Sequence, residues 1–363
     1  MVVVAGAGAG KTTVLSRRLA WLVDQGAAPA EVLALTFTQK AAAELGGRAE
    51  SLLGRSHETL RVMTFHAWAR DLVRAHGVEA GVLAPRDIIG EEERALMLLD
   101  RLAELDLRHY DMRGDPASVV ERLIGRIDRF RDNLVPADRV LAWARDRVDN
   151  AGRPADRTRA ERELEFATAF AAHDRWLEEA GLEDFGGSLA RAIELLRSEP
   201  AAHAAACEGT RHVLVDEFQD TNYAQAQLLY EVSDRAESVV VVGDDDQGIY
   251  RFRGASTKNI ADFRHRYPAC AEARLVINFR SLQRILDASG AVVAPLPDRD
   301  PKELRAADGS DGPPPRLWSA PDPAGEALAV ASEIRRLADE GMPYEEQAVL
   351  MRAVRLEARP IVE

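Results

Sequence analysis

Lysine is nearly missing from this 363-residue sequence, in which arginine supplies most of the 47 positive charges. The four lysines are Lys11, Lys40, Lys258 and Lys302. The skew itself is typical of compositional bias in a genome and says little about function. A lysine ammonium, however, is a compact point charge that the planar guanidinium of arginine does not imitate. The few positions that keep lysine are therefore of interest for ligand binding.

Cysteine and long apolar runs are also scarce. Cys207 and Cys270 are the only cysteines, and they lie far apart without the spacing of a metal or redox site. We therefore expect a reducing, cytoplasmic location. The longest apolar runs are too short to cross a bilayer, so no membrane association is expected. The opening MVVVAGAGAG lacks the basic segment of a secretory signal.

An excess of positive charge is the third absence. The formal net charge of −13 at pH 7 excludes a protein coated with basic surface for nucleic acid, although a narrow basic or aromatic track is still compatible with it. Hydrophobic residues at 46% and charged residues at 29% are ordinary for a soluble globular protein. The length allows two or three domains.

Apolar runs alternate with helical stripes over much of the chain, which predicts an α/β fold with a parallel sheet and helices packed against it. Strands are predicted at residues 2–5, 31–38, 212–218, 238–244, 273–279 and 347–352, and 61–68 is predicted to run from a strand into a helix. Helices are predicted at residues 12–23, 39–53 and 325–340. The amphipathic helical stretches within residues 85–199 predict a mostly helical insertion. The proline-rich stretch 295–315 predicts a loop or linker.

Residues 5–13, AGAGAGKTT, fit the relaxed form of the phosphate-binding loop pattern. The glycines let backbone N–H groups turn toward phosphate oxygens, and the following helix adds a favourable dipole. Lys11 is expected to reach the β- and γ-phosphates, and Thr12 to ligate Mg²⁺. A chance match is the alternative, which the strand–loop–helix context disfavours. The predicted nucleotide-binding residues here are Ala5, Gly6, Ala7, Gly8, Ala9, Gly10, Lys11, Thr12 and Thr13.

A second constellation ends the apolar run HVLVDEF at residues 212–218. Asp216 would hold Mg²⁺, and Glu217 would orient and deprotonate the attacking water as general base. An apolar run that ends in Asp-Glu is common by itself. Together with the phosphate loop, it predicts hydrolysis of a nucleoside triphosphate. The two halves lie too far apart for one crossover, which the helical insertion explains.

Six segments resemble, in order, the motifs of the UvrD/Rep-type superfamily 1 DNA helicases. The segments are AGAGAGKT, LTFTQKAAAEL, MTFHAWA, VLVDEFQDTN, VVGDDDQGIYRFRGAS and VINFRS. In EDFGGSLARAIELL (183–196), which is similar to another family segment, Gly186 and Gly187 stand where acids are usual. The resemblance implies a motor that uses ATP and Mg²⁺ to move 3′ to 5′ on single-stranded DNA or 3′-tailed duplexes, with repair or recombination proteins as partners.

The resemblance also implies a domain organisation. Residues 1–82 and 184–275 would form a RecA-like ATPase domain, residues 83–183 its helical insertion, and residues 276–363 the beginning of a second RecA-like domain. The family's adenine-binding glutamine motif would precede the first strand, and its last two motifs would follow residue 363. We therefore hypothesise a fragment that binds nucleotide weakly and unwinds DNA poorly on its own.

The resemblance implies that two groups of residues contact DNA, one at residues 36–40 together with His66 and the other at residues 250–253. Phe252 would stack on a base, where many relatives carry Trp, and Arg253 would hold the DNA backbone or reach back toward phosphate. Without the resemblance, Phe37 would equally be a core aromatic, and His66 a satisfied structural histidine. The residues implied to contact DNA are Thr36, Phe37, Thr38, Lys40, His66, Tyr250, Phe252 and Arg253.

The last nucleotide contacts are implied in the same way. Phe279 matches the adenine-stacking aromatic, here without the hydroxyl of the usual Tyr, and Arg280 matches the γ-phosphate arginine. Gln247 would sense the γ-phosphate. Because Mg²⁺ already has its ligands, we expect the acidic run Asp244–Asp246 to be structural and supporting rather than a metal site. The predicted catalytic residues are Lys11, Glu217, Gln247 and Arg280.

Three functional interpretations remain open at this point. The first is the helicase or translocase motor, and the second is a nucleotide-dependent DNA-binding module without motor activity. The third is the motor part of a helicase–nuclease, whose nuclease carboxylates would lie downstream. Kinase and GTPase interpretations leave the TFT, TFH and DDDQ segments unexplained.

Overall fold

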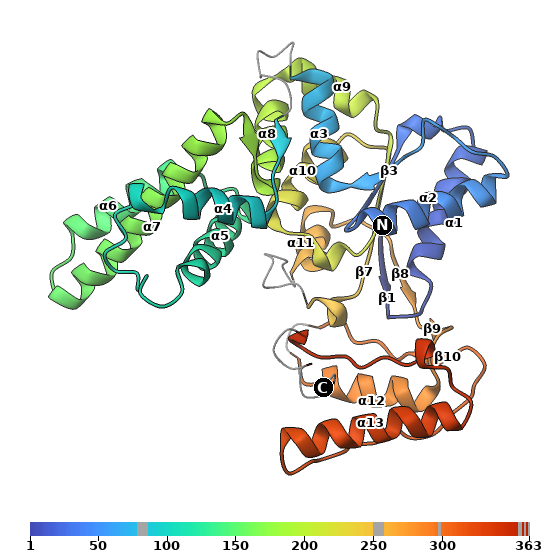
Figure 1. Cartoon of the computed structure of the whole chain (residues 1–363). Coiled ribbons are helices and arrows are strands. Elements are labelled where there is room, and N and C mark those ends of the chain that lie inside the picture. The colour runs from blue at the N-terminus through green and yellow to red at the C-terminus, as the bar shows by residue number, and fades with distance from the viewer. Residues whose placement is uncertain (78–85, 250–257, 297–298, 355–357, 359–360, 362–363) are drawn as a thin grey trace. The chain divides into compact units, whose positions relative to one another are not determined.

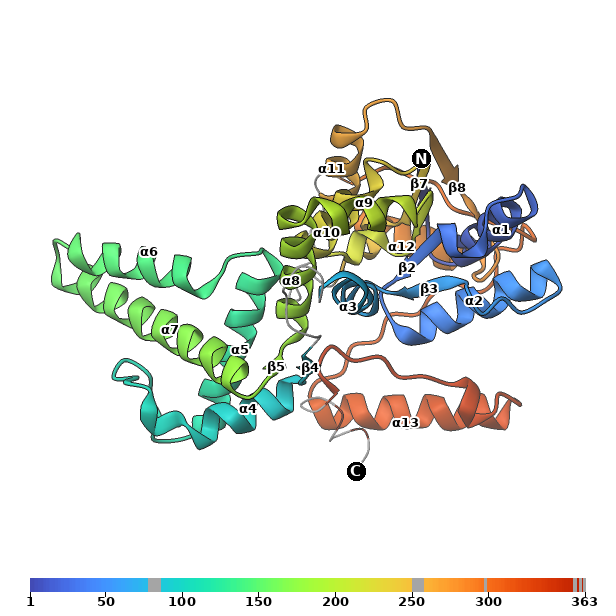
Figure 2. The ribbon, with the colours of Figure 1, turned by 90° about the horizontal axis from the view of Figure 1, so that it is seen from above.

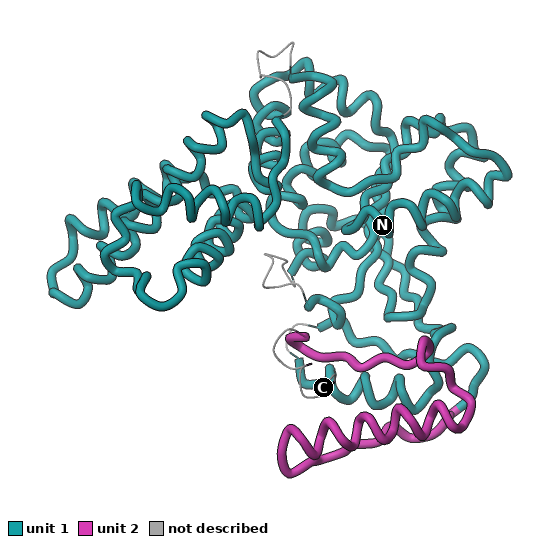
Figure 3. The backbone as a smooth tube through the Cα atoms, in the orientation of Figure 1, with its two compact units in different colours: residues 1–310 teal, residues 311–363 magenta. Residues whose placement is uncertain are grey.

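The computed structural model describes residues 1–77, 86–249, 258–296, 299–354, 358 and 361. These residues belong to two compact units, residues 1–310 and residues 311–363 (Figure 3). The predicted DNA contacts Tyr250, Phe252 and Arg253 lie outside the described residues. None of the helices in the described ranges is long and apolar enough to cross a membrane.

A six-stranded sheet forms the centre of the first unit, with the strand order β3-β2-β6-β7-β1-β8. Every neighbouring pair is parallel; in register, Val2 faces Val241 on one side and Glu272 on the other. The strands are β1 (Val2–Ala5), β2 (Val32–Thr36), β3 (Arg61–Thr64), β6 (His212–Val215), β7 (Ser238–Gly243) and β8 (Glu272–Leu275). The α/β fold and its parallel sheet are confirmed.

Side chains alternate across this sheet and are buried on both faces. In β1, Val2 and Val4 join one core cluster, whereas Val3 and Ala5 join the other. Continuous apolar strands such as VVVA are the expected sequence of a sheet covered on both sides. One face is covered by α1 (Lys11–Asp24) and α2 (Gln39–Leu53). The other is covered by α3 (Phe65–His76), α8 (Phe185–Ser198), α9 (Pro200–Glu208), α10 (Tyr223–Ser233) and α11 (Asn259–Arg266) (Figure 1).

A helical insertion lies between α3 and α8 in the sequence, and its helices α4–α7 lie together on the left in Figure 2. Its helices pack around two apolar clusters of their own, one centred on Phe166 and Phe170 and one on Trp176. It consists of β4 (Asp87–Ile88), α4 (Glu91–Asp100), η2 (Leu102–Glu104), α5 (Pro116–Asp132), α6 (Ala137–Asp149), α7 (Pro154–Glu179) and β5 (Leu182–Glu183). At its base, β4 and β5 pair in parallel. The predicted boundaries at 82/83, 183/184 and 275/276 stay predictions.

The strand predicted at 273–279 is divided between two sheets. β8 ends at Leu275, and β9 (Ile277–Asn278) pairs instead with β10 (Arg305–Ala306). The division turns Asn278 toward the loop that follows β1, where its side chain donates a hydrogen bond to the Ala7 carbonyl oxygen. The remaining elements of this unit are η1 (Pro29–Glu31), η3 (Phe218–Asp220), η4 (Asp245–Gln247) and α12 (Gln283–Val293).

The second unit contains α13 (Pro323–Asp339) and η6 (Tyr344–Glu346), so the helix predicted at 325–340 is confirmed. The strand predicted at 347–352 is wrong, because these residues form no ladder within the part of the chain that the structure describes. A strand requires a partner, and in this unit no other described segment is extended and paired. Val349 instead lines a hollow with Trp318 and Ile334 of α13.

Candidate active site

The loop after β1 has the shape that phosphate binding requires. Gly8 and Gly10 have φ angles of 73° and 87°, which lie in the left-handed region that glycine adopts readily. A Cβ atom on Gly8 would lie 2.7 Å from the Cβ of Arg280, so only glycine fits there. No side chain caps the start of α1, which leaves first-turn N–H groups to face an anion.

Lys11, the first residue of α1, is 8% exposed and lies at the centre of a polar cluster. Its Nζ is 2.5 Å from Glu217 Oε2 and donates a longer hydrogen bond of 3.4 Å to Gln247 Oε1. The three residues come from three separate segments of the sequence. They meet because parallel strands β1, β6 and β7 all end at the same edge of the sheet.

Asp216 and Thr12 form the second part of the site. The Thr12 hydroxyl donates to Asp216 Oδ2 across 3.3 Å. Burial, followed by the neighbouring Glu217 carboxylate, raises the pKa of Asp216 to about 6. Two hard oxygen groups beside a phosphate loop fit Mg²⁺, which takes few protein ligands and completes its shell with water and phosphate oxygens. Among the described residues, no group of three or more His, Cys, Asp or Glu side chains is placed to hold a metal ion, and the Mg²⁺ contacts of Thr12 and Asp216 stay predictions.

The backbone of Glu217 is in an uncommon conformation. Its φ of 48° lies in the left-handed region, which costs a non-glycine residue about 1 kcal/mol or more. Gln219 supports this turn, because its Nε2 donates to Glu217 Oε2 across 2.7 Å and its Oε1 accepts from the Asp244 N–H across 2.9 Å. Gln247 Nε2 in turn donates to the Asp244 carboxylate. Hydrogen bonds through Gln219 and Asp244 therefore connect Glu217, the candidate general base, with Gln247, the candidate γ-phosphate sensor.

Phe279 and Arg280 lie against the phosphate loop. The Phe279 N–H donates to the Gly8 carbonyl oxygen across 2.9 Å, and Phe279 as a whole residue is 74% exposed. The Asn278 side chain, besides binding Ala7, accepts hydrogen bonds from the N–H groups of Arg280 and Ser281 at 2.8 and 2.6 Å. An open aromatic face and an arginine are therefore fixed beside the loop. Their contacts with adenine and γ-phosphate stay predictions.

The acidic run Asp244–Asp246 is neutralised from within the chain. Lys302 Nζ lies 2.6, 2.8 and 2.7 Å from the carboxylates of Asp244, Asp245 and Asp246. Arg299 also forms a bidentate ion pair with Asp246. This agrees with the expectation of a structural, supporting role for the three aspartates.

The residues implied to face DNA follow β2 and β3 at the same sheet edge. The Thr36 hydroxyl is buried and donates to the Thr38 carbonyl oxygen, while the Thr38 hydroxyl caps α2 by accepting from Ala41 N–H. Lys40 is exposed and Phe37 half-buried. The DNA contacts of these residues stay predictions.

His66, in the first turn of α3, packs edge-on against Phe185 with the ring centroids 5.3 Å apart. Burial lowers the pKa of His66 to about 4, so its imidazole is neutral at physiological pH. A DNA contact by His66 would therefore be a hydrogen bond or a stacking contact rather than an ion pair. That contact, too, stays a prediction.

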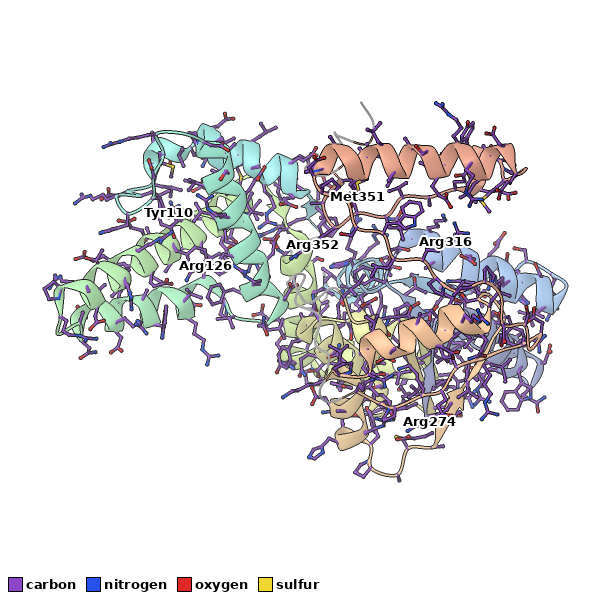
Figure 4. The ribbon with its side chains drawn as sticks, turned by 90° about the horizontal axis from the view of Figure 1, so that it is seen from below. Tyr110, Arg126, Arg274, Arg316, Met351 and Arg352 are labelled. Atoms are coloured by element: carbon purple, nitrogen blue, oxygen red, sulfur yellow. The ribbon has the colours of Figure 1, made fainter. Side chains whose placement is uncertain are left out.

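A basic hollow on the insertion was not anticipated from the sequence. It has a volume of about 600 Å³, lies between α5 and α7, and is lined by five arginines but only one acid, Glu163. Arg126 lies 3.9 Å from the Phe166 ring centroid and Arg162 lies 4.9 Å from that of Tyr110; Figure 4 labels Tyr110 and Arg126. The arginines are Arg122, Arg126, Arg129, Arg159 and Arg162.

Other site residues were also missed, for different reasons. Gln219 and Asn278 lie within two of the recognised segments, VLVDEFQDTN and VINFRS, and their position inside these segments was the available signal. Lys302 lies within the proline-rich stretch 295–315 and carries no local pattern. Its rarity as a lysine was the only sequence signal, and rarity does not indicate a partner.

A parallel sheet covered on both faces, a phosphate loop after β1 and an Asp-Glu pair after β6, two strands away in the same sheet, together define a RecA-like phosphate-loop domain. Residues 1–268 match the family model described as the UvrD/REP helicase N-terminal domain. The chain belongs to this family.

Curated relatives agree with this assignment. The chain is 34% identical over 357 residues to DNA helicase II of Escherichia coli, covering 97% of this chain and 46% of the relative. It is 33% identical to ATP-dependent DNA helicase UvrD1 of Mycobacterium tuberculosis and 30% identical to ATP-dependent DNA helicase PcrA of Staphylococcus epidermidis, with 97% of this chain covered in both cases and 45% and 46% of the relatives. The chain thus spans about half the length of the curated relatives it matches.

Proposed function

We propose that the chain contributes the ATP-hydrolysing part of a DNA helicase that moves 3′ to 5′ on single-stranded DNA. One observation carries the proposal: Lys11, Glu217 and Gln247, from three separate motifs, meet within hydrogen-bonding distance beside the phosphate loop. The names of the relatives, which are all helicases, support the same activity.

The geometry supports a separate role for each of these residues in ATP hydrolysis. The loop N–H groups and Lys11 would bind the phosphates, and Glu217 would orient a water molecule and accept its proton. Thr12 and Asp216 would hold Mg²⁺, which supplies charge neutralisation on the phosphates when it is bound. Lys11 now pairs with Glu217, so phosphate binding would draw the ammonium away and release the carboxylate as a base.

DNA as the partner is supported by the basic hollow between α5 and α7. Five arginines against one acid concentrate positive charge on one surface of a chain whose net charge is −13. Such a surface attracts the phosphate backbone without reading the base sequence. An acidic protein with one basic surface binds nucleic acid at that surface rather than all over.

The proposal is tested by phosphate release from Mg-ATP with and without single-stranded DNA. We expect DNA to stimulate release, and Lys11→Ala to reduce the stimulated rate by about 10²-fold or more because it removes a charge aimed at the transferred phosphoryl group. Arg17→Ala, on the exposed part of the same helix, is the matched control and should keep the rate. Hydrolysis that is insensitive to DNA would contradict the proposal.

A nucleotide-dependent DNA-binding module without motor activity is the second candidate. It predicts that ATP changes DNA affinity while duplexes with 3′ or 5′ tails both stay intact. The motor predicts strand separation that depends on ATP and on a 3′ tail. Comparing the two tailed duplexes therefore distinguishes the candidates and tests polarity in the same experiment.

A further inference from the structure

A short segment after α12 contacts three parts of the nucleotide site. Arg299 and Lys302 bind the acidic run Asp244–Asp246, which immediately precedes Gln247, as described above. Leu304 lies over the phosphate loop, because a Cβ on Gly6 would come within 2.6 Å of a Leu304 methyl group. The next residues form β10, which pairs with the strand that ends in Asn278. We call residues 299–306 the bridging segment.

Lys302 is the most deeply placed charge of the bridging segment. Its side chain is 3% exposed, and those of Asp244, Asp245 and Asp246 are 3%, 10% and 12% exposed. Three carboxylates so close together repel one another unless a cation lies among them. Burial opposes the charged ammonium, but the hydrogen bonds that it donates to the three aspartates outweigh burial and raise the pKa of Lys302 to about 12. Lys302 is therefore charged at every physiological pH.

The link from Lys302 to the candidate catalytic residues is short. Asp244 uses one carboxylate oxygen for Lys302 and the other for the Gln247 side chain. The same Asp244 Oδ1 accepts from the Asp246 N–H, which shapes the turn η4. The carboxamide oxygen of Gln247 accepts a hydrogen bond from the Lys11 ammonium. Lys302 thus determines, through Asp244, where the Gln247 carboxamide points.

We propose that Lys302 is a positioning residue for Gln247, and that the bridging segment aligns this side chain with the phosphate loop during turnover. This inference rests on the proposed ATP hydrolysis. It assigns no contact between Lys302 and nucleotide. Because the segment touches Gly6 and the acidic run together, a shift of the segment would move both sides of the γ-phosphate position at once.

The test compares Lys302→Gln, Gln247→Ala and the double variant in DNA-stimulated phosphate release. We expect Lys302→Gln to lower kcat about tenfold or more, with KM for ATP changed less than about threefold, as for an interaction made mainly in the transition state. Lys302→Arg, which keeps the charge but not the compact shape of the ammonium, should restore part of the lost kcat. If Lys302 acts through Gln247, the double variant should be no slower than Gln247→Ala within about twofold. Additive losses in the double variant would overturn the proposal.

A second readout does not depend on ATP. Hydrogen exchange of the free chain should speed up at residues 244–249 in Lys302→Gln, because the turn loses its fixed Asp244 carboxylate. Unchanged exchange there would overturn the proposal even if the chain hydrolyses no ATP. Conversely, faster exchange without any DNA-stimulated hydrolysis in the unsubstituted chain would retain the positioning role and reject the proposed function.

Two further variants separate positioning from general destabilisation. Arg274→Gln is the matched control: its guanidinium pairs with Asp300 of the same segment across 2.6 Å but is 44% exposed and touches none of the three aspartates (Arg274 is labelled in Figure 4). It should leave kcat and exchange at 244–249 unchanged. If Lys302→Gln does not fold, Arg299→Gln removes one of the two cations that hold Asp246, leaves Lys302 in place, and should give the same exchange pattern at smaller amplitude. A kcat loss in Arg274→Gln equal to that in Arg299→Gln would contradict the proposal.

Discussion

The sheet edge and the helical insertion both hold charges away from water, but they do so in different ways. At the sheet edge, the groups follow the ends of β1, β6 and β7 and converge on the space above the phosphate loop. In the insertion, Arg94 is 3% exposed and lies among groups from other helices, at 2.7 Å from Asp128 and 3.6 Å from Asp184. The first arrangement gathers charge beside the phosphate loop, where we propose that nucleotide binds, whereas the second joins helices to one another and to α8.

This difference predicts opposite responses to mutation. Removing a sheet-edge charge should impair turnover and leave the fold intact, since the strands are held by apolar contacts on both faces. Removing an insertion charge should destabilise the chain, since its partners stay buried without compensation. The predictions below test this contrast.

Glu217→Gln should have the largest effect. The amide keeps the size of the side chain but cannot accept a proton, so DNA-stimulated kcat should fall about 10²–10⁴-fold. Binding of a fluorescent ATP analogue should change little. Glu237→Gln, an exposed carboxylate paired with Arg211, is the control and should behave like the unsubstituted chain. Activity retained in Glu217→Gln would remove Glu217 from the role of general base.

Arg94→Ala should instead reduce stability. It leaves Asp184, which is 1% exposed, with one guanidinium, that of Arg131 at 3.4 Å, and it removes the 2.7 Å partner of Asp128, so the free energy of unfolding should fall by about 3–5 kcal/mol. Urea unfolding followed by tryptophan fluorescence measures this loss. Arg108→Ala breaks an exposed pair with Asp106 and should cost less than about 1 kcal/mol. Equal losses in the two variants would abolish the contrast between the regions.

Asp132, at the end of α5, should make stability depend on pH. Burial, with a smaller contribution from Asp128, raises the pKa of Asp132 to about 7. The folded chain therefore binds a proton that the unfolded chain has lost, and stability should fall as pH rises from about 4 to about 7. Asp132→Asn, which keeps a hydrogen-bonding oxygen for Asn222, should remove this contribution and gain about 1–3 kcal/mol at pH 8. A pH profile of unfolding parallel to that of the unsubstituted chain would contradict this assignment.

The basic hollow should give the smallest effect. Arg122→Gln and Arg159→Gln should each weaken DNA binding at low salt and reduce the salt slope by about one unit, as for one lost phosphate contact. Turnover at saturating DNA should not change. Arg145→Gln, on the exposed part of α6, is the control for charge alone. A slope that falls equally in the control would locate the DNA elsewhere.

The same contrast decides what the sequence could predict. The phosphate loop, Asp216, Glu217 and Gln247 each lie within a few residues of a strand end, so local patterns locate them and parallel strands bring them together. The ion pairs of Arg94 join helices whose separation in the chain gives no local signal. Lys302 is a similar case, because two helices and two strands separate it in the sequence from its partners Asp244–Asp246. The strand predicted at 347–352 failed for the related reason that a local pattern does not supply a pairing partner.

The pairing of β4 with β5 has a consequence for how the chain folds. The sheet must join β2 to β6, which are separated in sequence by the whole insertion. Because Asp87 pairs with Leu182, and Ile88 with Glu183, the entry and exit of the insertion lie side by side. Once that stem has formed, the entropy of closing the β2–β6 loop corresponds to a much shorter connection. The insertion then acts as a self-closed branch, whose length can vary without slowing assembly of the sheet.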